Sequence, residues 1–382
     1  MTESKSAFSQ QSQQTTQASQ LNQILHLQVA PGRIVKGENC LAVSGDVITT
    51  LGKRFLVVGG ENSLSVVKPR LQFLETEYDC HCHYQSYYPD CCEHTIERLC
   101  QEVKSHQADA VIGAGGGKAL DAAKLVAQKC QLPVVTIPTS AATCAAWTAL
   151  SNIYSDKGAF QYDVPLSQCP NVLILDYNLV ATAPRATLAA GIGDALAKWY
   201  ESSVSSGNST ASLTIAAVQQ ARVLRDILFQ KAEEALAHPL TPTWKEVVDA
   251  TVLLAGISGG LGGASCRTVG AHAVHNALTY FPETRRHLHG AKVAYGILVQ
   301  LRLEEIIGHS QLAATARKQL LKFYKVIGLP STLEELSLNN ITLGQLRQCA
   351  EIACKPESDI HRLPFPVTVD NVVMAMVSTT ID

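Results

Sequence analysis

The sequence AVIGAGGGKALDAAKLVAQK, residues 110–129, decides the fold of this chain. It opens with a short apolar run, passes through three consecutive glycines at 115–117, and continues with residues that favour a helix. A buried strand that ends in a glycine turn and leads directly into a helix is typical of a parallel α/β sheet. The glycines let the backbone approach a pyrophosphate closely, and the helix N-terminus adds amide donors and a positive dipole.

The turn at residues 113–118 matches neither of the standard nucleotide-binding signatures. Lys118 occupies the last position of the pattern Gly-x-Gly-x-x-Gly, and a Walker loop needs four residues between its glycines and then Gly-Lys-Ser/Thr. A tight turn with no ligand is therefore the alternative interpretation. The position between a strand and a helix favours phosphate binding.

The first half of the chain repeats this alternation of strands and helices. Apolar runs at 55–60, 133–138 and 171–176 read as further strands, separated by stretches of helical length. Strands interleaved with helices predict parallel pairing with right-handed crossovers. We therefore predict a Rossmann-like, dinucleotide-binding α/β domain over residues 27–185.

The second half has a different pattern. It is rich in Ala and Leu at helical spacing, with few alternating β-branched residues, over 186–235, 243–262, 268–280 and 290–352. We predict an all-α, metal-binding domain over residues 186–382. Because ligands of open α/β sheets bind beyond the carboxyl ends of the strands, the active site is expected in the cleft between the halves.

Composition narrows the class of protein. A chain of 382 residues with 46% hydrophobic and 17% charged residues can bury the cores of two domains. The net charge of −2, without a lysine-rich block, argues against a nucleic-acid partner. No apolar run reaches the roughly 18 residues of a membrane span, and no secretory signal is visible. We expect a cytoplasmic protein with a tail, residues 1–26 rich in Gln, Ser and Thr, that is disordered.

The chain has 12 cysteines, with the densest group in Cys80-His81-Cys82-His83, Cys91, Cys92 and His94. Structural zinc sites use Cys-x2-4-Cys or His-x3-5-His pairs, which this group supplies poorly. A reducing cytosol also keeps thiols unpaired. We interpret these cysteines as incidental, with a structural zinc site as the alternative.

Three residues far apart in the chain are candidate metal ligands. Asp194 lies in an apolar stretch of small residues, read as a helix start, where an unpaired carboxylate is costly and therefore needs a cation or a capping role. His272 and His275 share one side of a helix, and His289 follows a polar turn. One carboxylate and two or three imidazoles suit zinc or ferrous iron with an open substrate position. The alternatives are hydrogen-bonded core histidines and a helix cap.

Several of these segments resemble the iron-containing alcohol dehydrogenase superfamily, in particular its glycerol dehydrogenase branch. The resemblance runs in order over about residues 27–380. The matching segments are GGGKALDAAK (115–124), PTSAATCAAWTALSNIY (138–154), AGIGDALAKWYE (190–201), AHAVHNALT (271–279), HGAKVAYG (289–296) and IHRLP (360–364). It implies a dehydroquinate synthase-like fold and a nicotinamide cofactor, NAD or NADP, with one divalent metal, zinc or iron.

The same resemblance implies roles for individual residues. Asp194, His272 and His289 would hold the metal, and His275 would sit beside it as a catalytic residue that can relay a proton. The cofactor pocket would be formed by Gly116, Gly117, Lys118, Thr139, Thr148, Leu150 and Tyr154.

Two departures from glycerol dehydrogenases concern the substrate. Cys144 stands where those enzymes carry an aspartate that meets the polyol, and Arg267 stands where they carry a glycine. Losing a negative charge and gaining a guanidinium both favour an anion, and an arginine fork matches a carboxylate. Both changes resemble the hydroxycarboxylate dehydrogenase branch, which reduces 2-oxo acids. The alternative is that Arg267 faces solvent or pairs with a surface carboxylate.

These features predict a metal-dependent, NAD(P)-linked oxidoreductase that transfers hydride to or from a small hydroxy or oxo compound, a 2-hydroxy or 2-oxo carboxylate in particular. Glycerol or polyol dehydrogenase is the alternative. NADP stays open because Gly60 occupies the position of the family's aspartate, although Glu61 follows it. A dehydroquinate synthase-like lyase and a non-catalytic sensor are the remaining alternatives. We expect a homo-oligomer.

Overall fold

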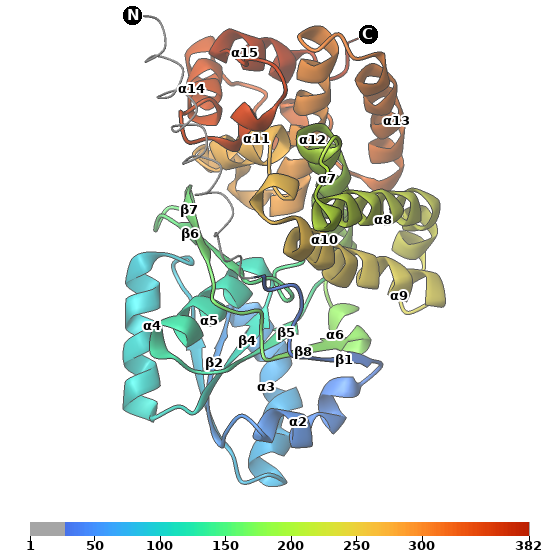
Figure 1. Ribbon diagram of the computed structural model, residues 1–382. Helices are drawn as coiled ribbons and strands as arrows, with labels where there is room; N and C mark the ends of the chain where they lie inside the picture. The colour runs from blue at the N-terminus through green and yellow to red at the C-terminus, as the bar shows by residue number, and fades with distance from the viewer. Residues whose placement is uncertain (1–26, 382) are drawn as a thin grey trace, which may run out of the picture.

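The computed structural model describes residues 27–381 and shows two stacked halves, a sheet with its helices and a set of helices (Figure 1). The tail expected at residues 1–26 lies outside the described residues. Six strands form one parallel sheet in the order β1-β8-β5-β4-β2-β3. The strands are β1 (Arg33–Gly37), β2 (Arg54–Gly59), β3 (His81–Ser86), β4 (Ala110–Gly115), β5 (Val134–Pro138) and β8 (Val172–Asp176).

The sheet is buried on both faces, and its central strands are largely apolar. In β2, Phe55 and Val57 pack into one core, and Leu56 and Val58 pack into another on the opposite face. Continuous apolar runs of this kind are typical of parallel strands covered by helices on both sides. The covering helices are α2 (Gly45–Thr49), α3 (Glu61–Thr76), α4 (Glu93–His106) and α5 (Gly117–Cys130), and α6 (Tyr177–Val180) follows the last strand.

Residues 185–381 contain helices and no strand, as the sequence predicts. The long helix α7 packs against α8 and α12, α10 packs against α7 and α8, and α13 packs against α8 and α12. The bounds are α7 (Arg185–Ser206), α8 (Ser212–Ala237), α9 (Pro242–Asp249), α10 (Ala255–Gly262), α11 (Gly270–Leu278), α12 (His289–Ile306), α13 (Gln311–Ile327), α14 (Leu343–Ala353) and α15 (Val369–Val377). None of the helices described is both long and apolar enough to cross a membrane.

The structure contains four strands that the sequence pattern does not reveal. β1 and β3 are the edge strands of the sheet, and their residues are mostly exposed or half-buried. Edge strands need no continuous apolar run, so the polar segment 81–86, quoted above for its cysteines and histidines, pairs with β2. The other two strands, β6 (Leu150–Tyr154) and β7 (Phe160–Pro165), form an antiparallel hairpin.

Helix boundaries also differ from the sequence interpretation. The helical stretch at 186–235 is two helices, α7 and α8, separated by residues 207–211. Asp194 lies in the interior of α7, nine residues after its first residue Arg185, so it is neither at a helix start nor a cap. A carboxylate in mid-helix has no unpaired backbone amide to accept from, because those amides occur only in the first turn.

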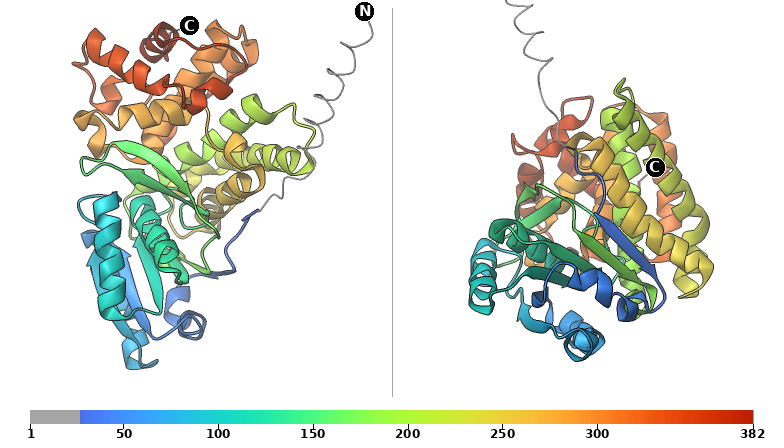
Figure 2. Two further views of the ribbon diagram at one scale, coloured as in Figure 1. Left: turned by 60° about the vertical axis from the view of Figure 1, so that its left-hand side comes forward. Right: turned by 60° about the horizontal axis from the view of Figure 1, so that its bottom comes forward.

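The hairpin connects the two halves. Figure 2 shows it extending from the sheet half toward the helices of the second half. The Phe160 amide donates to Thr279 Oγ1 at the end of α11, over 2.8 Å. Asp163 of β7 forms an ion pair with Arg267, which precedes α11. The hairpin is therefore attached to the helical half as well as to the sheet half.

Candidate active site between the two halves

A cavity of about 980 Å³ lies between the sheet half and the helical half. Its walls come from the glycine turn before α5, the loop at 140–148, the hairpin, and helices α7, α11 and α12. A cleft of this size beyond the carboxyl ends of parallel strands is where α/β proteins bind small ligands.

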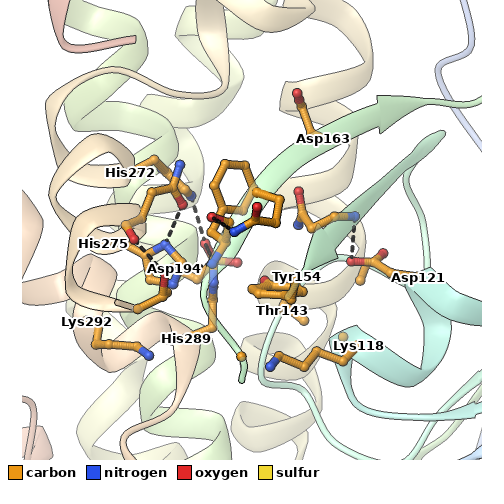
Figure 3. Close-up of a pocket in the computed structure, with 18 of the residues that line it drawn as sticks. Lys118, Asp121, Thr143, Tyr154, Asp163, Asp194, His272, His275, His289 and Lys292 are labelled. Atoms are coloured by element: carbon orange, nitrogen blue, oxygen red, sulfur yellow. Dashed lines mark hydrogen bonds and ion pairs between the residues drawn. The ribbon is translucent and has the colours of Figure 1, made fainter. Parts of the chain in front are cut away.

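Three helices bring the predicted metal ligands to one point of this cavity. Asp194 comes from the middle of α7, His272 from the first turn of α11, and His289 is the first residue of α12. Asp194 Oδ1 lies 3.5 Å from His272 Nε2 and 3.4 Å from His289 Nε2, and the three donor atoms lie within 4.8 Å of one another (Figure 3). It is the one group of three such donors among residues 27–381.

The arrangement fits a metal ion by geometry and by chemistry. Donors held about 2.0–2.1 Å from a tetrahedral ion are about 3.3 Å apart, close to the two distances observed here. Asp194 is 3% exposed, and its Oδ1 accepts no hydrogen bond from any residue that the structure describes. A buried carboxylate oxygen without a donor is unfavourable unless a cation compensates it.

The electrostatics of Asp194 favour the ionised form. Burial alone would raise the pKa of its carboxyl, but the Lys198 ammonium and the imidazoles of His272 and His289 outweigh burial and hold the pKa well below its usual value. Asp194 is therefore a carboxylate, the form that binds a metal.

Glu201, which the sequence interpretation did not single out, orients His272. Its Oε2 lies 2.6 Å from His272 Nδ1, and its Oε1 accepts from the amides of Val269 and His272. A fully buried carboxylate in this position keeps a proton on Nδ1, so that Nε2 is the nitrogen directed toward Asp194. The available signal was spacing, since Glu201 follows Asp194 by seven residues, which places both on one face of α7.

The charge on His272 reflects this pair of carboxylates. Burial would lower its pKa, but Glu201 and Asp194 raise the pKa to about 9, so without a metal the imidazole is protonated near neutral pH. A bound metal ion would take the place of that proton, as metal binding by histidine requires.

His275 lies beside the ligands. Its ring centroid is 4.1 Å from that of His289, and its Nδ1 lies 2.9 Å from Asn276 Oδ1. Burial and the neighbouring His289 and Lys292 hold the pKa of His275 well below its usual value, so the imidazole is neutral. A neutral ring that donates from Nδ1 keeps its Nε2 available as a proton acceptor.

The glycine turn forms another wall of the cavity. β4 ends at Gly115, which has φ +154°, and α5 begins at Gly117. A side chain at Gly117 would lie 2.9 Å from Thr143, whereas one at Gly116 would meet nothing closer than 3.9 Å. Gly116 therefore leaves room at the N-terminus of α5, the place where a pyrophosphate binds in such turns.

Six of the seven predicted cofactor residues line the cavity, namely Gly116, Gly117, Lys118, Thr148, Leu150 and Tyr154. Thr139 does not line the cavity, and its hydroxyl lies 3.3 Å from that of Ser63. Lys118 forms an ion pair with Asp90 over 2.6 Å and lies over the Tyr154 ring, 4.2 Å from its centroid. Figure 3 shows Lys118 and Lys292 approaching each other from opposite sides of the pocket.

The two residues that distinguish this chain in the substrate region also line the cavity. Cys144 is buried, and burial raises the pKa of its thiol, so it is uncharged. Arg267 is bonded to Asp163 over 2.9 Å, so its guanidinium already has a carboxylate partner on the hairpin. Pairing with a surface carboxylate was the alternative left open for Arg267 on sequence grounds.

Two further lysines that line the cavity were not assigned from the sequence. Lys198 is 4% exposed, and Lys292 is 7% exposed. Burial and the nearby Lys118 lower the pKa of Lys292 to about 8.

Comparisons with known proteins identify the family of this chain. The family described as iron-containing alcohol dehydrogenase matches residues 31–177. The chain is 56% identical to an uncharacterized oxidoreductase of Synechocystis, covering 94% of this chain and 93% of the relative. It is 35% identical to a glycerol dehydrogenase of Pseudomonas putida over 91% and 95% of the two chains. With hydroxycarboxylate dehydrogenase A of Escherichia coli it shares 39% identity over 73% and 77%.

The fold is likewise similar to a solved one. A probable glycerol dehydrogenase from Sinorhizobium meliloti superposes with a TM-score of 0.82 at 28% identity, covering 93% of this chain and 97% of that one. The relatives from Synechocystis and Pseudomonas putida align with this chain over nearly their whole length, and the solved structure shares both halves of the fold. The similarity therefore extends over the whole protein and is not limited to one common domain. The chain therefore belongs to the iron-containing alcohol dehydrogenase family and is an oxidoreductase.

Proposed function

We propose that this protein is a metal-dependent, NAD(P)-linked dehydrogenase that interconverts a small 2-hydroxy carboxylate and the corresponding 2-oxo carboxylate. The observation that carries the proposal is the meeting of Asp194, His272 and His289 in a cavity that also contains the glycine turn. The cavity has a wall suited to a dinucleotide and, opposite it, a set of donors suited to a divalent cation.

The residues of the chain would hold the reactants and move the proton. When bound, a divalent metal would polarise the substrate oxygen and a nicotinamide would exchange a hydride with the adjacent carbon. Asp194, His272 and His289 would hold the metal, and Glu201 keeps His272 in the tautomer that can bind it. The buried, neutral His275 would accept the proton that the substrate hydroxyl releases.

Two observations support a carboxylate substrate. The position that carries an aspartate in glycerol dehydrogenases is here the uncharged, buried Cys144, so no fixed anion repels a carboxylate there. The relative from Escherichia coli is named a hydroxycarboxylate dehydrogenase. Glycerol or another polyol is the second candidate, because the relative from Pseudomonas putida is named a glycerol dehydrogenase. Arg267 stays a predicted contributor, although its ion pair with Asp163 has to open before it can bind a substrate.

The test is a substrate panel on protein whose metal content has been measured. Glycerol, simple alcohols and several 2-oxo acids are assayed with NADH, NADPH or their oxidised forms, following nicotinamide absorbance. Zinc-loaded and iron-loaded protein are compared, because the same ligands accept both metals. We expect the highest kcat/KM for a 2-oxo acid. A higher value for glycerol would replace the carboxylate proposal with the polyol alternative. Substrate consumption without net nicotinamide change would indicate the lyase alternative.

A further inference from the structure

Lys198 is a buried cation in the cavity without a partner. It lies one helical turn after Asp194 on α7 and is 4% exposed. Among the described residues 27–381, none forms a hydrogen bond or an ion pair with its ammonium group. The side chain lines the cavity that contains the metal ligands. The carboxylate that acts on its charge is Asp194, and a bound metal ion would take up that carboxylate, so the buried ammonium would then call for another anion.

Three other cations near the cavity already have carboxylate partners. Lys118 is paired with Asp90, and Arg267 is paired with Asp163. The buried Lys124 is bonded to Asp121 and to carbonyl oxygens of the 145–150 loop. Lys292 also has no contact partner among the described residues. Its charge acts on His275 and His289, and Lys118 and Asp90 act on it, so it lies between the metal ligands and the glycine turn, where a cofactor phosphate would bind.

The surroundings of Lys198 place it on the metal side of the cavity. The positive charge of Lys198 lowers the pKa of Asp194, of His272 and of Cys144. These three residues are therefore its near neighbours. Residues four apart on a helix have neighbouring side chains, with Cβ atoms about 5–6 Å apart. Asp194 and Lys198 thus present a metal ligand and an ammonium side by side. An aspartate at position 144 would give this ammonium an internal counter-ion, whereas the neutral Cys144 does not.

We propose that Lys198 binds the carboxylate of the substrate and is the residue that selects 2-oxo and 2-hydroxy acids over polyols. The proposal rests on the function proposed above. A 2-oxo acid carries its reacting oxygen and its carboxylate on adjacent carbons, so one molecule can reach the metal ligands and Lys198 together. Binding would compensate the buried charge, and a neutral polyol would leave it uncompensated.

The first experiment measures binding without turnover. Oxamate, an unreactive analogue of pyruvate, is titrated by calorimetry into metal-loaded protein saturated with the preferred reduced nicotinamide. We expect Lys198→Met to raise the oxamate Kd by about 10–100-fold, as expected for loss of a charged hydrogen bond, and Lys198→Arg to restore part of the binding. Lys231→Met is the matched control, because Lys231 is paired with Glu246 outside the cavity. Metal content and melting temperature establish that each variant is folded.

The second experiment leaves Lys198 in place. Cys144→Asp supplies a carboxylate within the protein that can pair with Lys198. Cys144→Asn is the control, because asparagine has nearly the same shape as aspartate and no charge. We expect the aspartate variant to lower the ratio of kcat/KM for pyruvate to that for hydroxyacetone, in which CH2OH replaces the carboxylate, by at least about tenfold relative to the asparagine variant. This pair tests the anion site even if Lys198→Met does not fold.

The outcomes separate the two proposals. If the unmodified protein binds oxamate and Lys198→Met binds it equally well, Lys198 is not the anchor and the dehydrogenase function stands. If Arg267→Met abolishes oxamate binding and Lys198→Met does not, the arginine is the anchor. If the unmodified protein reduces hydroxyacetone but neither binds oxamate nor reduces pyruvate, both the 2-oxo acid function and the role of Lys198 are wrong.

Discussion

At the scale of single residues, the site depends on which nitrogen of His272 carries a proton. Glu201 Oε2 accepts from His272 Nδ1, and Oε1 is occupied by two backbone amides. The carboxylate can therefore only accept, and this leaves His272 Nε2 free to bind a metal beside Asp194. Loss of such an outer partner typically lowers metal affinity by about 10–100-fold.

Glu201→Gln tests this positioning role. An amide NH2 opposite Nδ1 favours the opposite tautomer, with the proton on Nε2, so we expect metal affinity to fall about 10–100-fold. Titration of stripped protein with zinc, read by competition with a chelating dye, measures the affinity. Excess metal should restore activity to this variant but not to Asp194→Ala, which lacks a ligand. Unchanged zinc affinity in Glu201→Gln would contradict the role assigned to the carboxylate.

At the scale of elements, α7 and α12 approach closely enough to bring the metal-ligand candidates Asp194 and His289 together only because both helices carry glycine at their contact. Gly290 of α12 faces α7, and a Cβ at this position would lie 1.8 Å from the Ala190 carbonyl oxygen and 3.2 Å from Asp194 Cβ. Gly193 of α7 faces Gly290 from the other side of this contact. A Cβ added at Gly193 would lie 2.6 Å from the Gly290 carbonyl oxygen. This contact sets the separation of Asp194 and His289.

Gly290→Ala should therefore move α12 away from α7. Overpacking in a core costs about 1–3 kcal/mol or more, and the displacement also separates the ligands. We expect a lower melting temperature together with weaker metal binding. Gly344→Ala is the control, because a Cβ there meets nothing closer than 4.0 Å. Alanine in that helix should leave stability unchanged or slightly raise it. A normal melting temperature and metal affinity in Gly290→Ala would show that the helices are not held by this contact.

At the scale of the whole molecule, stability should depend on pH through Glu304 of α12. Its Oε1 accepts from Gln300, whose own carbonyl oxygen accepts from the first amides of α11. Burial raises the pKa of Glu304 to about 7 from 4.5. Between these pH values the folded protein holds a proton that the unfolded chain has released, so stability falls as pH rises and levels off above about pH 7.

Glu304→Gln removes this titration while keeping an acceptor for Gln300. The variant should unfold at a higher temperature than the parent at pH 8, by about 1–3 kcal/mol in stability, and at nearly the same temperature at pH 4.5. Thermal unfolding followed by circular dichroism at both pH values measures the difference. An equal effect at pH 4.5 and pH 8 would indicate a change in packing rather than in ionisation.

The sequence by itself determined the two-part architecture and the three metal-ligand candidates. Apolar runs of strand length and Ala/Leu-rich helical spacing are local signals, because burial of one segment is encoded in its own periodicity. The glycine turn at 113–118 was equally readable, since it combines a strand, small residues and a helix within one stretch. The resemblance to a family then selected Asp194, His272 and His289 from among other acidic residues and histidines.

The tertiary structure alone decided which charges meet. The edge strands β1 and β3 and the hairpin carry no continuous apolar run, so only their pairing reveals them. The pairing of Arg267 with Asp163 and the support of His272 by Glu201 join residues distant in the chain, and the lack of a contact partner at Lys198 depends on how the surrounding elements pack. Periodicity records whether a side chain is buried, whereas the partner of a buried charge is set by how separate elements pack against each other.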